Sequence, residues 1–406
     1  MLQHKRSEGL PKKSLKLRLK NTLPLVVSGL VIFFAGWFVG GGEFRVQSYR
    51  PTGENAKLPN RLDYSSVDTI YTSIKDNFDG KLTEADLLNG MKEGLAKATS
   101  DPYTEFFSAK DAKEFYGQIN GTFEGIGAEL GKDDNGNIVI ISPIAGFPAE
   151  KAGLKPKDIV AEINGTSTAD FAVDDAVKLI RGKAGTDVKL TLVREGSPLD
   201  ITVTRQSISI PSVKQEVKDG IGILTISRFG EDTNTLAKQA AQSFKDQNVK
   251  GVVLDLRGNP GGRLESAVVL SSLWLEDKII LTERRDNVVI QTYRSRGIAT
   301  LAGIPTVVLI NEGSASASEI TAGALHDNKV ATLIGLKTYG KGSVQQPIDL
   351  RDGSLLKVTV ARWFTPKGKN IDKYGIEPDK KVDITSEDIK AGRDPQLDAA
   401  LAQLKQ

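Results

Sequence analysis

Strands and helices are expected to alternate along the second half of the chain, and this alternation constrains its fold more than any other feature. Between about residues 210 and 384, short runs rich in Val, Ile and Leu are separated by longer segments with helical spacing. Strands that alternate with helices form a sheet whose faces the helices cover. The expected strands are 220–227, 251–256, 304–311 and 331–335, and the expected helices are 232–247, 263–275, 316–328 and the C-terminal run LDAALAQL. We therefore assign residues 208–406 to one α/β core.

A smaller unit, which we assign to residues 119–207, precedes this core. Runs typical of β-strands occur at 137–142, 158–165 and 187–195. A helix is expected between the last two runs, because apolar residues follow the i, i+3, i+4, i+7 pattern there. These residues are Val173, Ala176, Val177 and Ile180. The order of the elements resembles that of a PDZ domain.

The PDZ resemblance implies a site for the free C-terminus of a protein or peptide. In PDZ domains a turn of backbone N–H groups binds the terminal carboxylate, while the peptide adds as a strand. The residues at this turn are Gly125, Ile126, Gly127 and Ala128. A structural glycine turn without a ligand is the alternative. Arg181, at the end of the helix, is either a contact to the core or a solvated charge.

An uncharged segment near the N-terminus, residues 21–42, is long enough to span a membrane. About 20 mostly apolar residues cross the hydrocarbon layer, and Trp37 lies near one end of the segment. Residues 1–20 hold seven Lys or Arg against one acid, Glu8, which favours a cytoplasmic N-terminus and an extracytoplasmic remainder. We expect a single-pass anchor in the cell membrane, followed by a polar linker at 43–60. The alternative is a cleaved signal peptide, which would make the protein secreted.

The positive charge of the chain is concentrated in this tail. The formal net charge is +3 and the tail carries +6, so the rest of the chain carries −3. No nucleic-acid partner is expected on this basis. Cysteine is absent, which excludes disulfides, thiol catalysis and thiolate metal sites.

Residues 61–118 are expected to form a small helical domain, because apolar residues recur there at helical spacing. These residues include Leu87, Leu88, Met91, Leu95 and Ala98. Such a domain is more often a scaffold or a dimer contact than a site of chemistry. We therefore consider a homodimer as its assembly.

A serine-rich motif follows the expected strand 304–311, at the turn that should lead into the next helix. The turn reads SASASE at 314–319, with Ser316 in the middle. Unpaired N–H groups at a helix start favour developing negative charge, as a serine nucleophile requires. An N-cap serine is the plain alternative, but three alternating serines exceed what one cap requires.

Few bases are available to such a serine. The two histidines are His4, in the tail, and His326, ten residues beyond Ser316 on the same helix and so about 15 Å away. Neither a Ser-His-Asp triad nor a metal site is therefore expected. Lysine is the remaining base that serine chemistry uses.

Two lysines are candidates for this base. Ser354 and Lys357 have the S-x-x-K spacing, but in an expected strand residues i and i+3 point to opposite faces, so we reject them. Lys341 lies between Gly340 and Gly342, which allow the backbone to hold its side chain inward. Burial must lower its pKa toward the range of a general base. A solvated surface charge is the alternative.

These motifs resemble those of the carboxyl-terminal processing, or tail-specific, serine peptidase family. The similarity lies in residues 311–320 and 340–345. In that family the middle serine is the nucleophile and a lysine 25 positions later is the base, which implies Ser316 and Lys341. The resemblance also implies that Gln345 holds the lysine amine by a hydrogen bond.

A glycine-rich turn, LRGNPGG at 256–262, is similar to another motif of this family. The resemblance implies that backbone N–H groups of Gly261 or Gly262, with that of Ala317, form an oxyanion hole. The sequence does not distinguish the two glycines, and a β-turn without this role is the alternative. Asp327 matches a recurrent acid of the family, which we interpret as structural.

The resemblance covers residues 61–406 and implies a crotonase-like α/β core. The fold class is then α+β multidomain, with an anchor, a helical domain, a PDZ-like domain and this core. The expected function is a serine endopeptidase that recognises C-terminal tails of extracytoplasmic proteins, without a cofactor or metal. One rival is a non-catalytic PDZ adaptor, which the complete dyad disfavours. The other is an acyl-CoA enzyme, which leaves the PDZ-like unit and the anchor unexplained.

Overall fold

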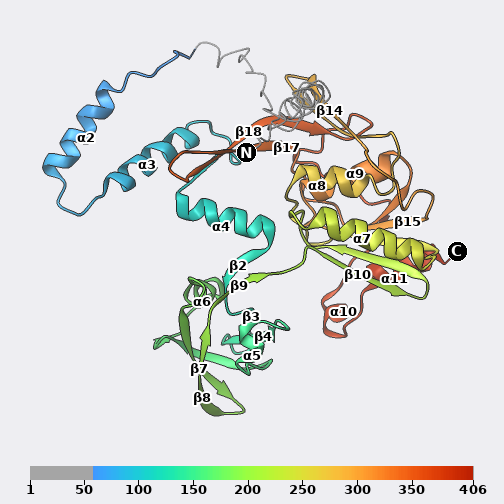
Figure 1. The fold of residues 1–406 in the computed structure, drawn as a ribbon, viewed down its shortest axis with the longest axis horizontal. Coiled ribbons are helices and arrows are strands. Elements are labelled where there is room, and N and C mark those ends of the chain that lie inside the picture. Colours follow the sequence, from blue (N-terminus) through green and yellow to red (C-terminus); the bar gives the residue numbers. More distant parts are fainter. Residues whose placement is uncertain (1–57, 406) are drawn as a thin grey trace, which may run out of the picture. The chain divides into compact units, whose positions relative to one another are not determined.

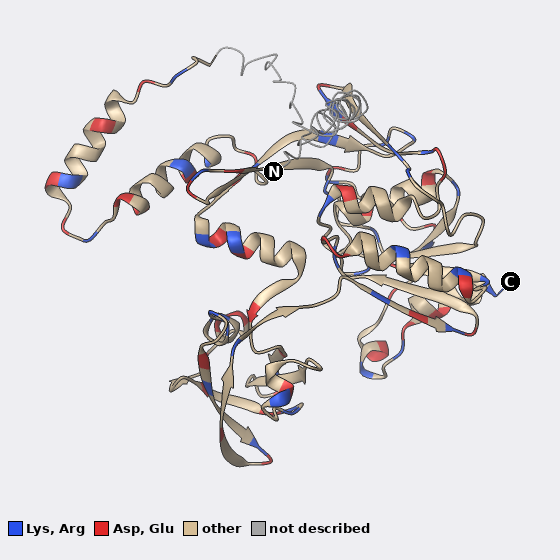
Figure 2. Ribbon diagram, in the orientation of Figure 1, with Lys and Arg blue, Asp and Glu red and all other residues tan. Residues whose placement is uncertain are grey.

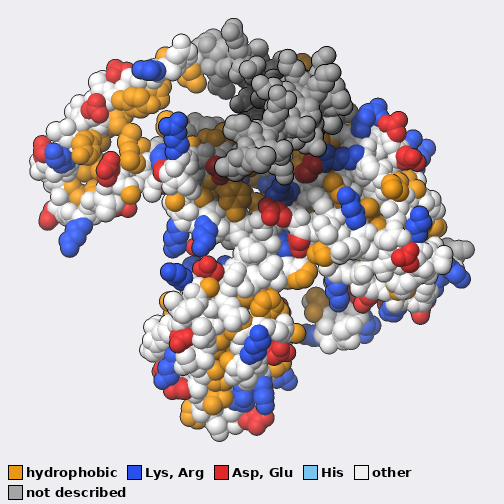
Figure 3. Space-filling view, in the orientation of Figure 1, with side chains coloured by type: hydrophobic (Ala, Val, Ile, Leu, Met, Phe, Trp, Pro, Cys, Tyr) orange, Lys and Arg blue, Asp and Glu red, His pale blue; other side chains and the backbone are white. Residues whose placement is uncertain are grey.

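The computed structural model describes residues 58–405 (Figure 1). The chain divides into two compact units, residues 1–81 and residues 82–406. In the first unit, helix α2 (Ser65–Asn77) buries none of its residues. Apolar side chains, Ile70 among them, are exposed along it (Figure 3).

The predicted tail (1–20) and membrane span (21–42) lie outside the described residues, as does most of the linker 43–60. Within the described range, no helix is both long and apolar enough to cross a membrane. Membrane anchoring therefore stays a prediction.

A six-stranded sheet forms the centre of the second unit, in the order β10-β11-β12-β15-β16-β19. The strands are β10 (Val213–Lys218), β11 (Ile221–Ile226), β12 (Gly251–Asp255), β15 (Thr306–Ile310), β16 (Ala331–Gly335) and β19 (Lys380–Lys381). Strand β10 is antiparallel to β11, and the other neighbours run parallel. The four strands predicted from the apolar runs are thus confirmed, with the parallel pairing that helical crossovers allow.

Helices cover both faces of this sheet (Figure 1). Successive strand residues point to opposite faces, so Leu224 packs with one set of helices and Ile223 with another. The first face carries α7 (Thr233–Asp246), α8 (Leu264–Ser271) and α9 (Ala317–Asp327), and the second carries α11 (Pro395–Leu404). A short helix, α10 (Ser386–Lys390), precedes α11. The predicted layers of the α/β core are confirmed.

A second sheet has the order β1-β18-β13-β14, with β17 paired to β18. Its strands are β1 (Glu105–Phe107), β13 (Ile279–Arg285), β14 (Val288–Arg294), β17 (Ser343–Asp349) and β18 (Leu355–Phe364). The sequence indicated only β18 as a strand. Strand β14, for example, is exposed along most of its length, so no apolar alternation marks it.

The helical domain predicted for residues 61–118 needs a correction. Helices α3 (Glu84–Lys97) and α4 (Ala109–Asn120) are present and carry charges of both signs (Figure 2). However, β1 lies between them and pairs antiparallel with β18. Three residues are too few to show a pattern, and this strand is specified by its partner. The unit boundary at Lys81 also separates α2 from α3.

The region assigned to a PDZ-like domain, residues 119–207, contains a sheet in the order β3-β4-β5-β7-β8, with β6 paired to β5. The strands are β3 (Ala128–Lys132), β4 (Ile138–Pro143), β5 (Ile159–Ile163), β6 (Thr166–Ser167), β7 (Asp187–Arg194) and β8 (Ser197–Thr204), and the helices are α5 (Pro148–Lys151) and α6 (Val173–Ile180). The chain enters and leaves through a ribbon of β2 (Thr122–Gly125) and β9 (Gln206–Ser209). The three predicted strands and the helix are confirmed.

Candidate active site

Ser316 lies where the chain leaves the large sheet and enters helix α9, of which it is the N-cap residue. Its φ of 54° is one that residues other than glycine rarely adopt. Its side chain is partly exposed, whereas Ala315 and Ala317 are buried. The predicted strand-to-helix turn is thus confirmed, and it presents one serine on a strained backbone.

The other two serines of the motif have structural contacts. Ser314 Oγ donates to the carbonyl of Leu256 at 2.8 Å, and Ser318 Oγ donates to the carbonyl of Asn259 at 2.9 Å. Both side chains are fully buried. They fasten the serine turn to the glycine-rich turn, which leaves the middle serine as the partly exposed one.

The glycine-rich turn packs directly against Ser316. A Cβ on Gly261 would lie 2.9 Å from Ser316 Cβ and 2.7 Å from the carbonyl oxygen of Ala315, which is closer than real Cβ atoms approach. The φ of Gly261 is 102°, outside the range of other residues. Glycine is therefore required here both by contact and by backbone conformation.

The two adjacent glycines differ in what their N–H groups bond. The N–H of Gly261 donates to Asn259 Oδ1 at 2.9 Å, and Asn259 is held in turn by the carbonyl of Ile226 at 2.7 Å. The N–H groups of Gly262 and Ala317 donate to no acceptor in the described part of the chain. The two glycines therefore differ in whether their N–H group already has an acceptor, and the oxyanion hole itself stays a prediction.

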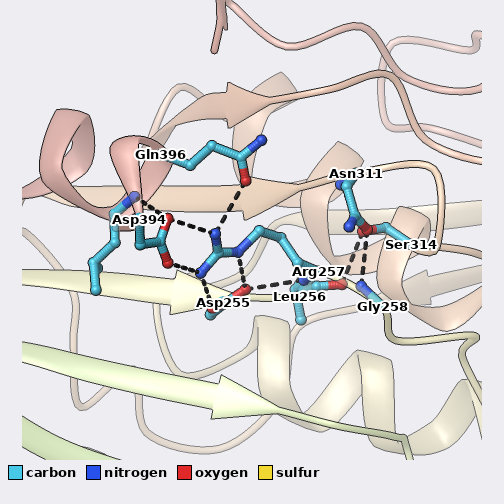
Figure 4. Close-up of polar contacts among 9 residues, drawn as sticks. Asp255, Leu256, Arg257, Gly258, Asn311, Ser314, Asp394 and Gln396 are labelled. Carbon is cyan, nitrogen blue, oxygen red and sulfur yellow. Dashed lines mark hydrogen bonds and ion pairs between the residues drawn. The ribbon is translucent and has the colours of Figure 1, made fainter. Parts of the chain in front are cut away.

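Arg257, a residue of the same turn, bonds residues at its own strand and near the C-terminus (Figure 4). The guanidinium bonds the carboxylates of Asp255 and Asp394 in pairs of contacts at 2.7 to 3.0 Å, and Gln396 Oε1 at 3.0 Å. Burial alone would lower the pKa of Arg257, but these carboxylates hold it above its usual value. Because Asp394 is the N-cap residue of α11, the network ties the C-terminal helix to the glycine-rich turn.

Lys341 lies in a turn that packs against the segment 372–375. A Cβ on Gly340 or Gly342 would lie 2.8 Å or 2.7 Å, respectively, from a backbone nitrogen of this segment. The carbonyl of Lys341 accepts a hydrogen bond from the indole N–H of Trp363 at 2.9 Å. Crowding thus explains the two glycines that flank the lysine.

The ammonium of Lys341 is half-buried, 5.1 Å from the centre of the Tyr103 ring. Burial lowers the pKa of Lys341 below its ordinary value, and the positive charge of Lys357 acts in the same direction. The carboxylates of Glu319 and Glu105 act in the opposite direction. The net direction is the one that a general base requires.

Gln345, on strand β17, lies four residues beyond Lys341. Its amide nitrogen donates to Ser343 Oγ at 2.7 Å and to Thr359 Oγ1 at 3.3 Å. Among the described residues, no hydrogen bond joins the Lys341 ammonium to Gln345 or to Ser316. The contacts that the resemblance implies for this lysine stay predictions.

Glu319 connects the serine turn to the lysine turn. Its Oε2 accepts the N–H of Ser316 at 2.8 Å and that of Lys341 at 3.0 Å. Its Oε1 accepts the N–H of Gly340 at 2.8 Å and the hydroxyl of Thr338 at 2.6 Å. The side chain is fully buried, and burial raises the pKa of Glu319 although the four donors act against it.

His326 and Asp327, at the other end of α9, have partners of their own. His326 Nε2 lies 3.0 Å from Asp379 Oδ1, and Asp327 Oδ2 accepts the backbone N–H of Lys367 at 2.9 Å. These contacts fit the structural interpretation of Asp327. They leave His326 outside the serine turn, as its distance along the helix predicts.

The predicted carboxylate-binding turn lies between β2, which ends at Gly125, and β3, which begins at Ala128. The carbonyls of Ile126 and Gly127 accept hydrogen bonds from backbone N–H groups at 2.8 and 2.9 Å. The N–H groups of these two residues have no acceptor within the described range. The Arg181 guanidinium lies over the ring of Phe123 on β2, 5.2 Å from the ring centre, a contact that the sequence did not suggest.

Two matches define the class of this protein. Residues 220–382 match peptidase family S41, and residues 118–193 match the PDZ domain. With the serine turn of the α/β core, they define a serine-type peptidase that carries a PDZ domain. The chain is 38% identical over 379 residues to the carboxy-terminal processing protease CtpA of Bacillus subtilis (strain 168), covering 92% of this chain and 78% of that protein. The chain belongs to the carboxy-terminal processing proteases of family S41.

Two further similarities agree with this assignment. A Staphylococcus haemolyticus (strain JCSC1435) protein named "Probable CtpA-like serine protease" is 38% identical over 324 residues, 79% of this chain and 65% of that protein. The solved structure of the photosystem II D1 C-terminal processing protease matches with a TM-score of 0.50 and 29% identity, covering 80% of this chain and 89% of that one. The similarity therefore extends over the PDZ domain and the core together.

Proposed function

We propose that this chain is an endopeptidase that uses a Ser316–Lys341 dyad to cleave extracytoplasmic proteins whose C-terminal tails bind its PDZ domain. One observation carries the dyad. A single carboxylate oxygen of Glu319 accepts the N–H groups of both residues, so the turns that bear them are adjacent. The lowered pKa of Lys341 supports its role as the base.

In this mechanism the neutral amine of Lys341 takes the hydroxyl proton while Ser316 Oγ attacks the scissile carbonyl. The resulting ammonium gives its proton to the leaving amine as the C–N bond breaks. Water then attacks the acyl carbonyl while Lys341 takes a proton from it. The ester C–O bond breaks, the lysine returns the proton to Ser316 Oγ, and the acid product leaves. Gln345 assists by orienting the lysine amine through its amide oxygen, since its amide nitrogen already donates to two hydroxyls.

The oxyanion is held by the N–H groups of Gly262 and Ala317. Both are without an acceptor in the described chain, whereas the N–H of Gly261 is used by Asn259. Removing one such donor typically reduces kcat about 10² to 10³-fold. Gly261 serves instead by allowing the turn to approach Ser316.

The C-terminal carboxylate of the substrate is bound at the turn 125–128. The free N–H groups of Ile126 and Gly127 support this role. Strand β3 is at the edge of its sheet, so its outer edge is open to an added peptide strand. A peptide with a free C-terminus should therefore bind better than the same peptide with a C-terminal amide.

The segment 21–42 anchors the protein, with the catalytic part outside the cytoplasm. The support is the charge asymmetry of the sequence, and accessibility of a tagged C-terminus to external protease in intact cells tests it. A homodimer is supported by an apolar face of α3, on which Leu88, Met91 and Leu95 are exposed. Sedimentation of the full chain tests that assembly.

The dyad is tested with a fluorophosphonate, which acylates activated serines. The wild type should be labelled, and Ser316→Ala and Lys341→Met should not be. Lys337→Met, in a surface ion pair four residues before Lys341, is the matched control and should label normally. Equal labelling of Ser316→Ala and the wild type would overturn the assignment, and an unlabelled wild type would favour an adaptor.

A further inference from the structure

The segment 101–107, which precedes the PDZ domain, is fixed to the sheet beside the lysine turn. Strand β1 of this segment pairs with β18, which also pairs with β17. Thr104 Oγ1 accepts the backbone N–H of Thr359 at 3.1 Å and donates to Asp101 Oδ2 at 2.7 Å. Because β17 begins two residues after Lys341, the segment and the lysine turn share one sheet.

Tyr103 of this segment covers the Lys341 ammonium. The 5.1 Å between Nζ and the ring centre is within the range of a cation–π contact. Burial raises the pKa of Tyr103 above its ordinary value, and Tyr339 and the negative charge of Asp372 act in the same direction. The phenol therefore stays neutral near pH 7, and its ring occupies a position where water would otherwise solvate the ammonium.

An ion pair lies on the strands next to this ring. Lys357 Nζ is 2.8 Å from Glu105 Oε2, and the two residues are direct partners in the β1–β18 register. The Lys357 ammonium also lies 5.0 Å from the ring centre of Phe107 and 5.5 Å from that of Phe115. Only 18% of the Lys357 side chain is exposed, so its charge is held in one place.

Three charged groups act on Lys341 from three elements. Lys357 of β18 disfavours the charged form of its amine, whereas Glu105 of β1 and Glu319 of α9 favour it. Glu319 already accepts hydrogen bonds from the backbone N–H groups of Ser316 and Lys341, so it cannot be changed without disturbing the site. The Glu105–Lys357 pair makes no such contact and can be changed separately.

We propose that the segment 101–107 positions the proposed general base: Tyr103 covers the Lys341 ammonium, and the pair of Glu105 with Lys357 of β18 sets the electrostatic field there. The inference rests on the proposed function, in which Lys341 is the general base. All three are positioning residues, since they act on a substrate only through that lysine.

The two members of the ion pair should shift the pH dependence in opposite directions. Acylation of Ser316 needs the neutral amine, so its rate rises with pH through the pKa of Lys341. Lys357→Met removes a positive neighbour and leaves the Glu105 carboxylate unpaired. Both changes raise the pKa of Lys341, so the rising limb of the plot of labelling rate against pH moves to higher pH. Glu105→Gln does the reverse. We expect shifts of about 0.5 to 1 pH unit for one partly screened charge.

Two further variants separate electrostatics from structural damage. In the double variant Glu105→Gln/Lys357→Met the opposite effects cancel, and the limb should return close to that of the wild type. Tyr103→Ala admits water, which stabilises the ammonium, so the limb moves to higher pH and the maximal rate falls. Tyr103→Phe keeps the ring and should keep the limb.

The experiment measures fluorophosphonate labelling of the full chain between about pH 6 and 11, with thermal unfolding of each variant as the control for folding. Opposite shifts for Lys357→Met and Glu105→Gln, with restoration in the double variant, support the inference. If the pH dependence of Lys357→Met and Glu105→Gln equals that of the wild type while Lys341→Met is still unlabelled, the inference is overturned and the proposed dyad is not. Normal labelling of Lys341→Met overturns both.

Discussion

One carboxylate oxygen of Glu319 accepts the backbone N–H of Ser316 at 2.8 Å and the backbone N–H of Lys341 at 3.0 Å. A fully buried carboxylate is costly unless its oxygens are bonded, and the four donors to Glu319 supply those bonds. Two turns that are 25 residues apart in sequence thus share a single acceptor. The position of the proposed nucleophile relative to its base depends on this one side chain.

Replacing Glu319 by Ala should therefore remove both stability and labelling. Four donors would lose their acceptor, and we expect the free energy of unfolding to fall by about 3 to 5 kcal/mol. Glu319→Gln keeps the shape of the side chain but turns an amide NH₂ group toward N–H donors. This variant should still fold, and it should be labelled more slowly than the wild type. Urea unfolding and fluorophosphonate labelling measure the two effects. Wild-type labelling of Glu319→Gln would contradict the role of the carboxylate.

The pH dependence of labelling should show a lysine whose pKa is depressed. Burial lowers the pKa of Lys341, so its neutral amine, and with it the rate, should appear at a lower pH than for an ordinary lysine. Lys341→Arg keeps the positive charge but cannot release a proton in this range. It should stay unlabelled at every pH, and a labelled Arg variant would argue against proton transfer.

The α/β core, the PDZ domain and the serine turn could be predicted because local patterns encode them. Buried parallel strands are continuous apolar runs, and α6 shows helical spacing. Glu319 also left a signal that the sequence analysis did not use. It is three residues beyond the N-cap serine of α9, a position where a carboxylate commonly accepts a hydrogen bond from the N-cap backbone N–H.

The second sheet could not be predicted, because its pairing is specified by partners far apart in sequence. Strand β1 is three residues long, and its partner Lys357 is 252 residues from Glu105. The sequence analysis rejected Lys357 as a base, and the structure gives it and Ser354 separate partners, since Ser354 Oγ bonds Asp352. Nothing local indicated that Lys357 acts on Lys341.

Ser316→Gly should stabilise the protein while it abolishes labelling. The φ of 54° and ψ of −113° strain a serine but not a glycine. Relief of this strain should add about 1 kcal/mol to the free energy of unfolding, or about 2 °C in Tm. Ser316→Ala retains the strain and should unfold close to the wild type. A Gly variant that unfolds below the Ala variant would show that the turn is relaxed with serine present.

Gly261→Ala should damage the site more than the same change at Gly258. Both glycines have a positive φ, of 102° and 64°, but a Cβ on Gly258 meets nothing within 4 Å, whereas one on Gly261 meets Ser316 and Ala315. We expect a loss of about 1 kcal/mol for Gly258→Ala, and of about 3 kcal/mol for Gly261→Ala because overpacking adds to strain. Displacement of Ser316 should also slow labelling about 10²-fold in the Gly261 variant alone. Equal rates in the two variants would mean that close packing of this turn is not what positions the serine.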